Sequence, residues 1–126
     1  MWLTPILPFM NDTEDNISGI LHMCTEVKVY GVICFGMGLT LREGNREYFY
    51  EQLDRLFFRL KEKYMQTYGN RYIVESSDSD RLMKLFNQKC SEGGMVHNNE
   101  HIFQYLHTFE EKNLMKQLSI FDLNIK

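Results

Sequence analysis

The sequence predicts an α/β fold, the C-terminal portion of a partial parallel (β/α) barrel, in which two parallel strands are followed mostly by helices. Residues 2–7 and 29–35 are continuous apolar runs, typical of strands that are covered on both faces. An amphipathic helix between them would complete a βαβ unit, which implies parallel strands. Two such strands need lateral neighbours, so the fold requires more strands than this sequence contains.

The bulk composition indicates one ordinary domain. The chain has 126 residues, 44% of them apolar and 25% charged. Its net charge of −3 excludes a global basic field that would attract nucleic acid. Four cations fall close together, namely Arg55, Arg59, Lys61 and Lys63. Interleaved carboxylates favour a solvated helix face over a binding site for this group.

The cysteines and the amino terminus indicate where in the cell the protein is located and whether part of the fold is missing. Cys24, Cys34 and Cys90 match no zinc or disulfide spacing, so we expect buried free thiols and a cytoplasmic location. The first eight residues lack a basic segment and are too short to span a bilayer, which predicts neither a signal peptide nor an anchor. Because neither a signal peptide nor an anchor is predicted, we expect no membrane association. Domains seldom begin on a buried strand, so we also expect a missing amino-terminal portion.

The helices follow from apolar periodicity. Asp12 or Thr13 is placed to cap a helix whose apolar stripe runs from Ile17 to Val27. Residues 36–45 read as a loop, and residues 46–68 as one helix or a broken pair that ends at Gly69. A brief strand is possible at residues 72–74. Two further helices are expected from Ser79 to the glycine pair at 93–94 and over residues 99–108.

These elements suggest three parts: residues 1–69 with the β-α-β-α units, residues 70–112 as a helical extension, and residues 113–126 as a flexible tail.

Ligands of parallel α/β proteins bind at the carboxyl ends of strands, where residues 8–12 and 36–45 would lie. Asn11 and Asp12 could equally serve as helix caps, and the glycines could serve only a turn. Arg42 suits a carboxylate or a phosphate, although a surface ion pair is an equal alternative.

Both loops carry a family resemblance. The segment TPILPFMNDTEDN at residues 4–16 resembles a strand-to-helix stretch of radical S-adenosylmethionine (SAM) enzymes, closest to the spore photoproduct lyase-like, or DNA repair photolyase, group. The segment FGMGLTLREGNREYFY at residues 35–50 is similar to the following strand, loop and helix of that group. The resemblance extends over nearly the whole chain.

The resemblance implies SAM and a 4Fe–4S cluster as cofactors and a DNA-related substrate. It would place Pro8, Asn11 and Asp12 near the cofactor, and Gly38, Thr40 and Arg42 on the substrate side. The family binds its cluster through a C-x-x-x-C-x-x-C motif, which this sequence lacks. The expected protein is therefore a C-terminal fragment, inactive alone, whose partner is the N-terminal half of the barrel.

Two further motifs remain. His97, Glu100 and His101 match the H-x-x-E-H pattern of some zinc proteases, but surface histidines are the favoured interpretation because only 25 residues follow. The segment QLSIF resembles the peptide by which bacterial DNA-processing proteins bind the sliding clamp. In this alternative the chain is a small helical interaction module. Its partner-binding residues would be Gln117, Leu118, Ile120 and Phe121. Folding of these side chains back onto the domain is the alternative.

Overall fold

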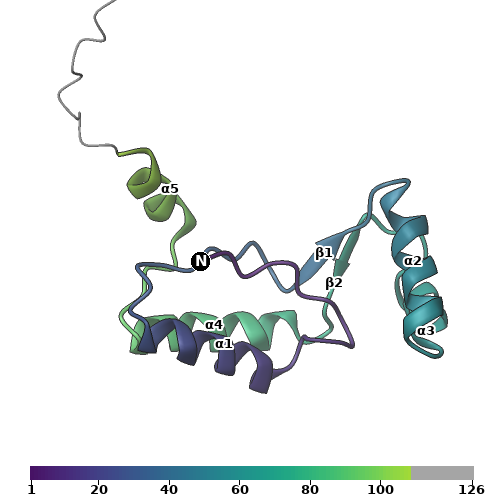
Figure 1. The fold of residues 1–126 in the computed structure, drawn as a ribbon, viewed down its shortest axis with the longest axis horizontal. Coiled ribbons are helices and arrows are strands. Elements are labelled where there is room, and N and C mark those ends of the chain that lie inside the picture. Colours follow the sequence, from purple (N-terminus) through teal and green to yellow (C-terminus); the bar gives the residue numbers. More distant parts are fainter. Residues whose placement is uncertain (109–126) are drawn as a thin grey trace, which may run out of the picture.

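The structure, a computed structural model, describes residues 1–108, and helices predominate in it. In chain order the elements are α1 (Glu14–Glu26), β1 (Gly38–Thr40), α2 (Asn45–Leu56), α3 (Leu60–Tyr68), β2 (Ile73–Glu75), α4 (Ser79–Glu92) and α5 (Asn99–His107). Helices α1 and α4 lie side by side, and the α2–α3 hairpin lies beyond β1 and β2, at the opposite end from α5 (Figure 1). Among these helices, none combines the length and apolar character needed to cross a bilayer.

The predicted partial parallel barrel is wrong. The sheet found in residues 1–108 has two short strands, β1 and β2, which pair antiparallel with Thr40 opposite Ile73. The predicted strand runs are extended, but they meet only at an isolated parallel bridge between Trp2 and Ile33. Pro5 has no amide hydrogen to donate, so the first run cannot continue a ladder. The apolar runs reflect burial of extended chain rather than membership of a wide sheet.

The predicted helices are confirmed. The Thr13 hydroxyl caps α1 by accepting a hydrogen bond from the Asn16 amide at 3.2 Å, and acidic residues occupy the first turn. The Asn98 side chain caps α5 in the same way through the amide of His101, at 3.0 Å. β1 falls within the segment predicted as a loop, because pairing with β2 makes it a strand.

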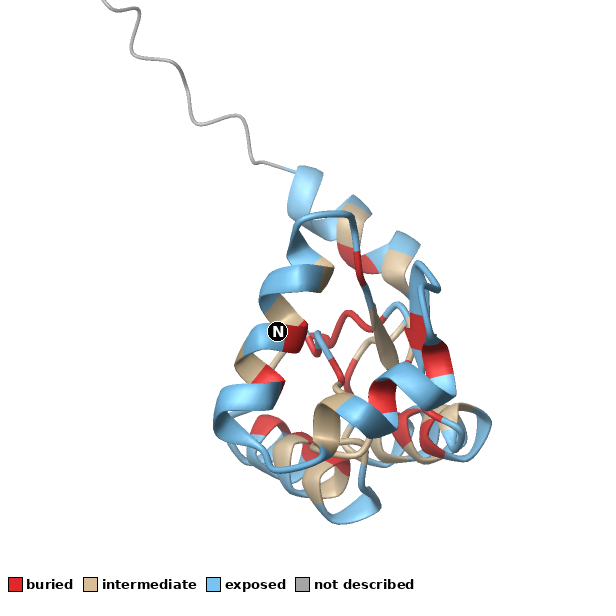
Figure 2. Ribbon diagram, turned by 90° about the vertical axis from the view of Figure 1, so that its right-hand side faces the viewer, coloured by how far each residue is buried: buried red, intermediate tan, exposed pale blue. Residues whose placement is uncertain are grey.

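The main core lies between α1, α4 and the extended chain above them. Each helix buries three residues at spacings of three or four, which places them on one face. These are Ile17, Leu21 and Cys24 of α1 and Leu82, Phe86 and Cys90 of α4. Val32 and Cys34 of the extended chain belong to the same cluster. Figure 2 shows buried residues on the inner sides of the elements and exposed residues outside.

A second apolar cluster holds the α2–α3 hairpin against the sheet. Its buried members are Leu41, Tyr50, Leu53, Tyr64, Tyr68 and Val74. The fully buried Tyr64 donates its hydroxyl hydrogen to the Pro8 carbonyl, which ties the hairpin to the loop before α1. Burial raises the pKa of Tyr64 far above its usual range, so this donor stays protonated at physiological pH.

Residues 46–68 form the broken pair of helices rather than one helix. Phe57 is extended, and Arg59 takes a φ of 62°, in the left-handed region. This conformation costs a residue with a side chain roughly 1–2 kcal/mol, so packing of the two helices must offset it. The resulting turn brings α3 back beside α2.

We predict that Phe86→Ala lowers the free energy of unfolding by about 3–5 kcal/mol, because it leaves a cavity between α1 and α4. Urea denaturation followed by circular dichroism measures the change. Phe58→Ala is the matched control, because the Phe58 side chain is 89% exposed and its loss should change stability by less than about 0.5 kcal/mol. Equal losses in the two variants would contradict the assignment of the core.

Candidate functional site

A groove of about 280 Å³ opens along β1 and β2, and we call it the strand groove. It is lined by Thr4, Phe35, Gly36, Gly38, Leu39, Thr40, Ile73 and Glu75. Most of this lining is apolar, and the large exposed side chains of Phe35 and Ile73 form part of it. An open groove of this size accommodates part of a ligand, such as a planar ring, rather than a whole cofactor.

Glycine at two positions makes the groove possible. A Cβ at Gly38 would lie 2.3 Å from the carbonyl oxygen of Val74, so any larger residue would push the two strands apart. Gly36 has a φ of 136°, which residues with a side chain rarely adopt. It turns the chain between the exposed Phe35 and the fully buried Met37.

A polar pair lies beside the groove. The Arg42 guanidinium donates from Nε to the hydroxyl of Tyr72 at 3.3 Å, and Tyr72 directly precedes the groove residue Ile73. This hydrogen bond and the positive charge of Arg42 lower the pKa of Tyr72, and a hydrogen bond with Thr40 acts in the same direction. Both side chains are exposed, so an anionic ligand in the groove could approach the guanidinium.

The residues predicted on the substrate side therefore lie close together in the structure. Gly38 and Thr40 line the strand groove, and Arg42 lies beside it with Tyr72 as its partner. Sequence reasoning missed Phe35, Ile73 and Glu75 as lining residues. The available signal was the adjacent pair Ile73 and Val74 in a short expected strand, because successive side chains of a strand face opposite sides and one of the two must point away from the core.

The residues predicted near the cofactor lie outside the groove lining and form internal hydrogen bonds. The side-chain oxygen of Asn11 accepts a hydrogen bond from the backbone amide of Leu7. The backbone carbonyl of Asn11 accepts one from the side-chain amide of Asn16 at 2.8 Å. Asp12 accepts from the Ser76 hydroxyl at 2.6 Å, which links the loop before α1 to the loop before α4. Pro8 is buried and accepts from Tyr64. These contacts give all three residues a structural role.

A continuous apolar surface adjoins the groove, and we call it the aromatic face. It consists of Trp2, Phe35 and Phe103, whose ring centroids lie 5.9–6.4 Å apart. Trp2 is 55% exposed and Phe35 is 66% exposed. Phe35 belongs to both the aromatic face and the strand groove, so the two features form one surface.

The thiols of the chain do not fit an iron–sulfur cluster. Cys24, Cys34 and Cys90 are all buried and unpaired. Burial raises the pKa of Cys34 and raises that of Cys90 to about 11, whereas a cluster needs thiolates. Within residues 1–108, no three side chains of the metal-binding types are grouped to hold a metal ion.

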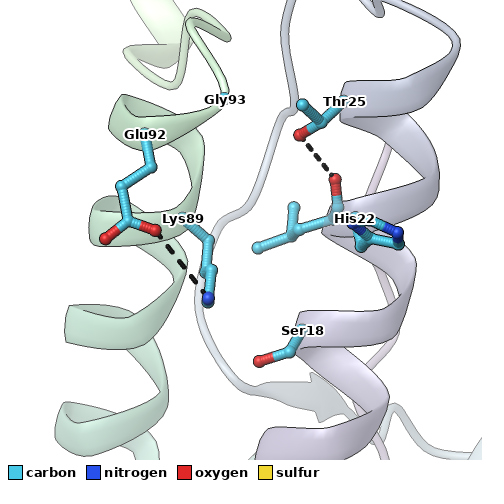
Figure 3. A pocket seen from close by; sticks show the side chains of 7 residues that line it. Ser18, His22, Thr25, Lys89, Glu92 and Gly93 are labelled. Atoms are coloured by element: carbon cyan, nitrogen blue, oxygen red, sulfur yellow. Dashed lines mark hydrogen bonds and ion pairs between the residues drawn. The ribbon is translucent and has the colours of Figure 1, made fainter.

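A second hollow lies between α1 and α4, on the outer side of the core (Figure 3). Ser18 and Lys89 extend into the space between the two helices. Lys89 lies 3.8 Å from the Glu92 carboxylate, and the Thr25 hydroxyl donates to the Leu21 carbonyl. Lys89 and Thr25 thus have partners within their own helices, which argues against a shared ligand in the hollow.

The histidines of the H-x-x-E-H pattern are separated by the start of α5. His97 precedes the helix, where its ring packs edge-on against Phe86 at 6.2 Å and Nδ1 lies 3.2 Å from the Met95 carbonyl. His101 is exposed in the first turn of α5. His97 therefore takes part in packing at the edge of the core.

The predicted clamp-binding residues Gln117, Leu118, Ile120 and Phe121 lie outside the described residues. Docking of this segment on a sliding clamp stays a prediction.

Comparison with known proteins identifies no relative: no family model, no curated protein and no solved structure matches the chain.

We predict that Arg42→Gln raises the pKa of Tyr72, because it removes the hydrogen bond and the positive charge that favour the phenolate. In the unsubstituted chain, Tyr72 should ionise at lower pH than the ordinary tyrosine value of about 10. NMR titration with ¹³C-labelled tyrosine measures this shift, and Arg55→Gln, on the α2–α3 hairpin, is the control. An unchanged Tyr72 titration in Arg42→Gln would show that the pair does not persist in solution.

Proposed function

We propose that this chain is the C-terminal part of a radical SAM enzyme of the spore photoproduct lyase-like group. In this proposal it is inactive alone and works with a polypeptide that carries the cluster-binding C-x-x-x-C-x-x-C motif. The observation that carries the proposal is the uncovered aromatic face beside the strand groove. Large exposed apolar patches on proteins mark interaction surfaces or ligand grooves.

The aromatic face supplies the apolar part of such an interface. Trp2 and Phe35 extend from two adjacent extended segments, and Phe103 extends from α5. Aromatic side chains contribute disproportionately to binding energy when a partner excludes water from them. The solvent exposure of Trp2 and Phe35 therefore favours a partner over an isolated role for the chain.

The backbone beside Trp2 supplies a polar part. The Leu3 amide donates to the Ile33 carbonyl and the Ile33 amide to the Met1 carbonyl, each at 2.9 Å. Both bonds lie on one edge of the extended segment, so the amide and carbonyl of Trp2 point to the other edge. Within residues 1–108 those two groups form no backbone hydrogen bond. An extended segment of a partner could pair with this free edge.

The side chains present indicate what this chain and its partner would each contribute to the enzyme. The partner must bring the cluster, because the three thiols here are buried and burial raises the pKa of Cys34 and Cys90. This chain would contribute one side of a substrate site through Gly38, Thr40 and Arg42, with the guanidinium available to an anionic group such as a phosphate of DNA. The proposal includes a cytoplasmic location, where free thiols persist.

Co-expression tests the proposal directly. The chain is produced together with the cluster-binding N-terminal half of a spore photoproduct lyase-like enzyme, and a brown complex containing iron and sulfide should co-purify. Trp2→Glu should reduce recovery of the complex by roughly tenfold or more, because it places a charge in the apolar interface.

Phe58→Glu is the control, because it adds the same charge at another exposed aromatic position, on the α2–α3 turn and away from the aromatic face. Circular dichroism establishes that both variants fold. Failure of the unsubstituted chain to bind the cluster-carrying half would refute the proposal, as would equal recovery of the complex with Trp2→Glu.

A further inference from the structure

The turn between α2 and α3 presents three consecutive apolar side chains to solvent, and we call them the hairpin tip. These are Leu56, Phe57 and Phe58, with exposed fractions of 60%, 43% and 89%. The exposure of Phe58 is the highest of any large apolar side chain in residues 1–108. Such a run opposes ordinary solubility and indicates a contact surface.

The tip is convex and lies away from the strand groove. β1 leads into the start of α2 and the end of α3 leads to β2, so the turn is at the end of the hairpin remote from the sheet (Figure 1). The turn has a defined backbone: the Phe57 amide donates to the Leu53 carbonyl at 2.9 Å, and the Leu60 amide donates to the Phe57 carbonyl at 3.1 Å. The left-handed Arg59 fixes the reversal.

Unpaired positive charge surrounds the tip. Residues 55–63 contain four cations and one carboxylate. Lys61 is 3.6 Å from Asp54, whereas Arg55 and Arg59 form no ion pair within the described chain. The Arg59 guanidinium lies over the Phe58 ring, 5.2 Å from its centroid.

We propose that the hairpin tip inserts into the surface of a lipid bilayer that contains anionic lipids. Leu56, Phe57 and Phe58 enter the boundary between headgroups and acyl chains, while Arg55 and Arg59 contact the negatively charged headgroups. The charge of the rim selects an anionic surface, and the apolar tip adds affinity that a purely electrostatic contact lacks. This function is independent of the strand groove and of any partner on the aromatic face.

Single-stranded nucleic acid is the competing anionic partner, and three features favour lipid. Proteins that bind single strands align stacking rings along a basic groove, whereas this tip protrudes. Leu56 offers no ring for base stacking. The Arg59 guanidinium lies over one face of the Phe58 ring, where a base would otherwise stack. An aliphatic and aromatic wedge with cations behind it suits a bilayer interface.

Vesicle co-sedimentation of the full chain tests the proposal. The probes are phosphatidylcholine vesicles with and without phosphatidylserine, and binding should be clearly stronger with phosphatidylserine. Phe58→Ser should weaken binding by roughly tenfold, since it removes the most exposed of the inserted side chains. Arg55→Gln combined with Arg59→Asn should remove the preference for anionic vesicles; asparagine tolerates the left-handed conformation at position 59.

Met23→Ser is the control, because Met23 is also an exposed apolar side chain, at 57%, but lies on α1. It should leave vesicle binding unchanged, and circular dichroism establishes that every variant folds. Absence of binding to anionic vesicles, or equal binding by Phe58→Ser, would overturn the proposal. Phe58-dependent binding of a single-stranded oligonucleotide without vesicle binding would overturn it in favour of nucleic acid.

Discussion

The packing of α1 against α4 beneath the extended chain is the constraint on which the rest of the structure depends. Both helices cover the same side of residues 29–35, where Val32 and Cys34 join their core. Side chains alternate along an extended chain, so Ile33 and Phe35 face the other side. There, the short helix α5 covers Ile33 through Ile102 but leaves Phe35 exposed. One-sided coverage thus creates the aromatic face.

Two hydrogen bonds relate the core to the strand groove. Ser76 to Asp12 links the loops that precede α4 and α1, and Tyr64 to Pro8 links the hairpin to the loop before α1. The segments before and after β2 are therefore both tied to the loop before α1. Asn11 and Asp12, which the family resemblance would place near a cofactor, contribute to this anchoring in the described structure.

The helices could be predicted from the sequence because their apolar spacing and their caps are local. The stripe of Ile17, Leu21 and Cys24, with Thr13 as the cap, is sufficient to define α1. The strands could not be predicted in the same way, because an apolar run does not reveal what lies beside it. Residues 2–7 are apolar since they pack against helices and adjacent chain, and Pro5 interrupts any ladder because it has no amide hydrogen to donate.

The candidate site was predictable only in part. Glycine at positions 36 and 38 and the nearby Arg42 indicated a binding edge. The structure places the two glycines in the lining of the strand groove and Arg42 beside it. Tyr72, Ile73 and Glu75 come from a distant segment that joins the site through antiparallel pairing with β1. That pairing depends on a long-range register, which local periodicity does not contain.

Acrylamide quenching of Trp2 fluorescence tests the central claim, an uncovered aromatic face that a partner occupies. The chain contains one tryptophan, so the signal comes from the face itself. We expect efficient quenching in the isolated chain and strong protection in the complex with a cluster-carrying partner. A protected Trp2 in the isolated chain, or quenching that does not change in the complex, would contradict the account.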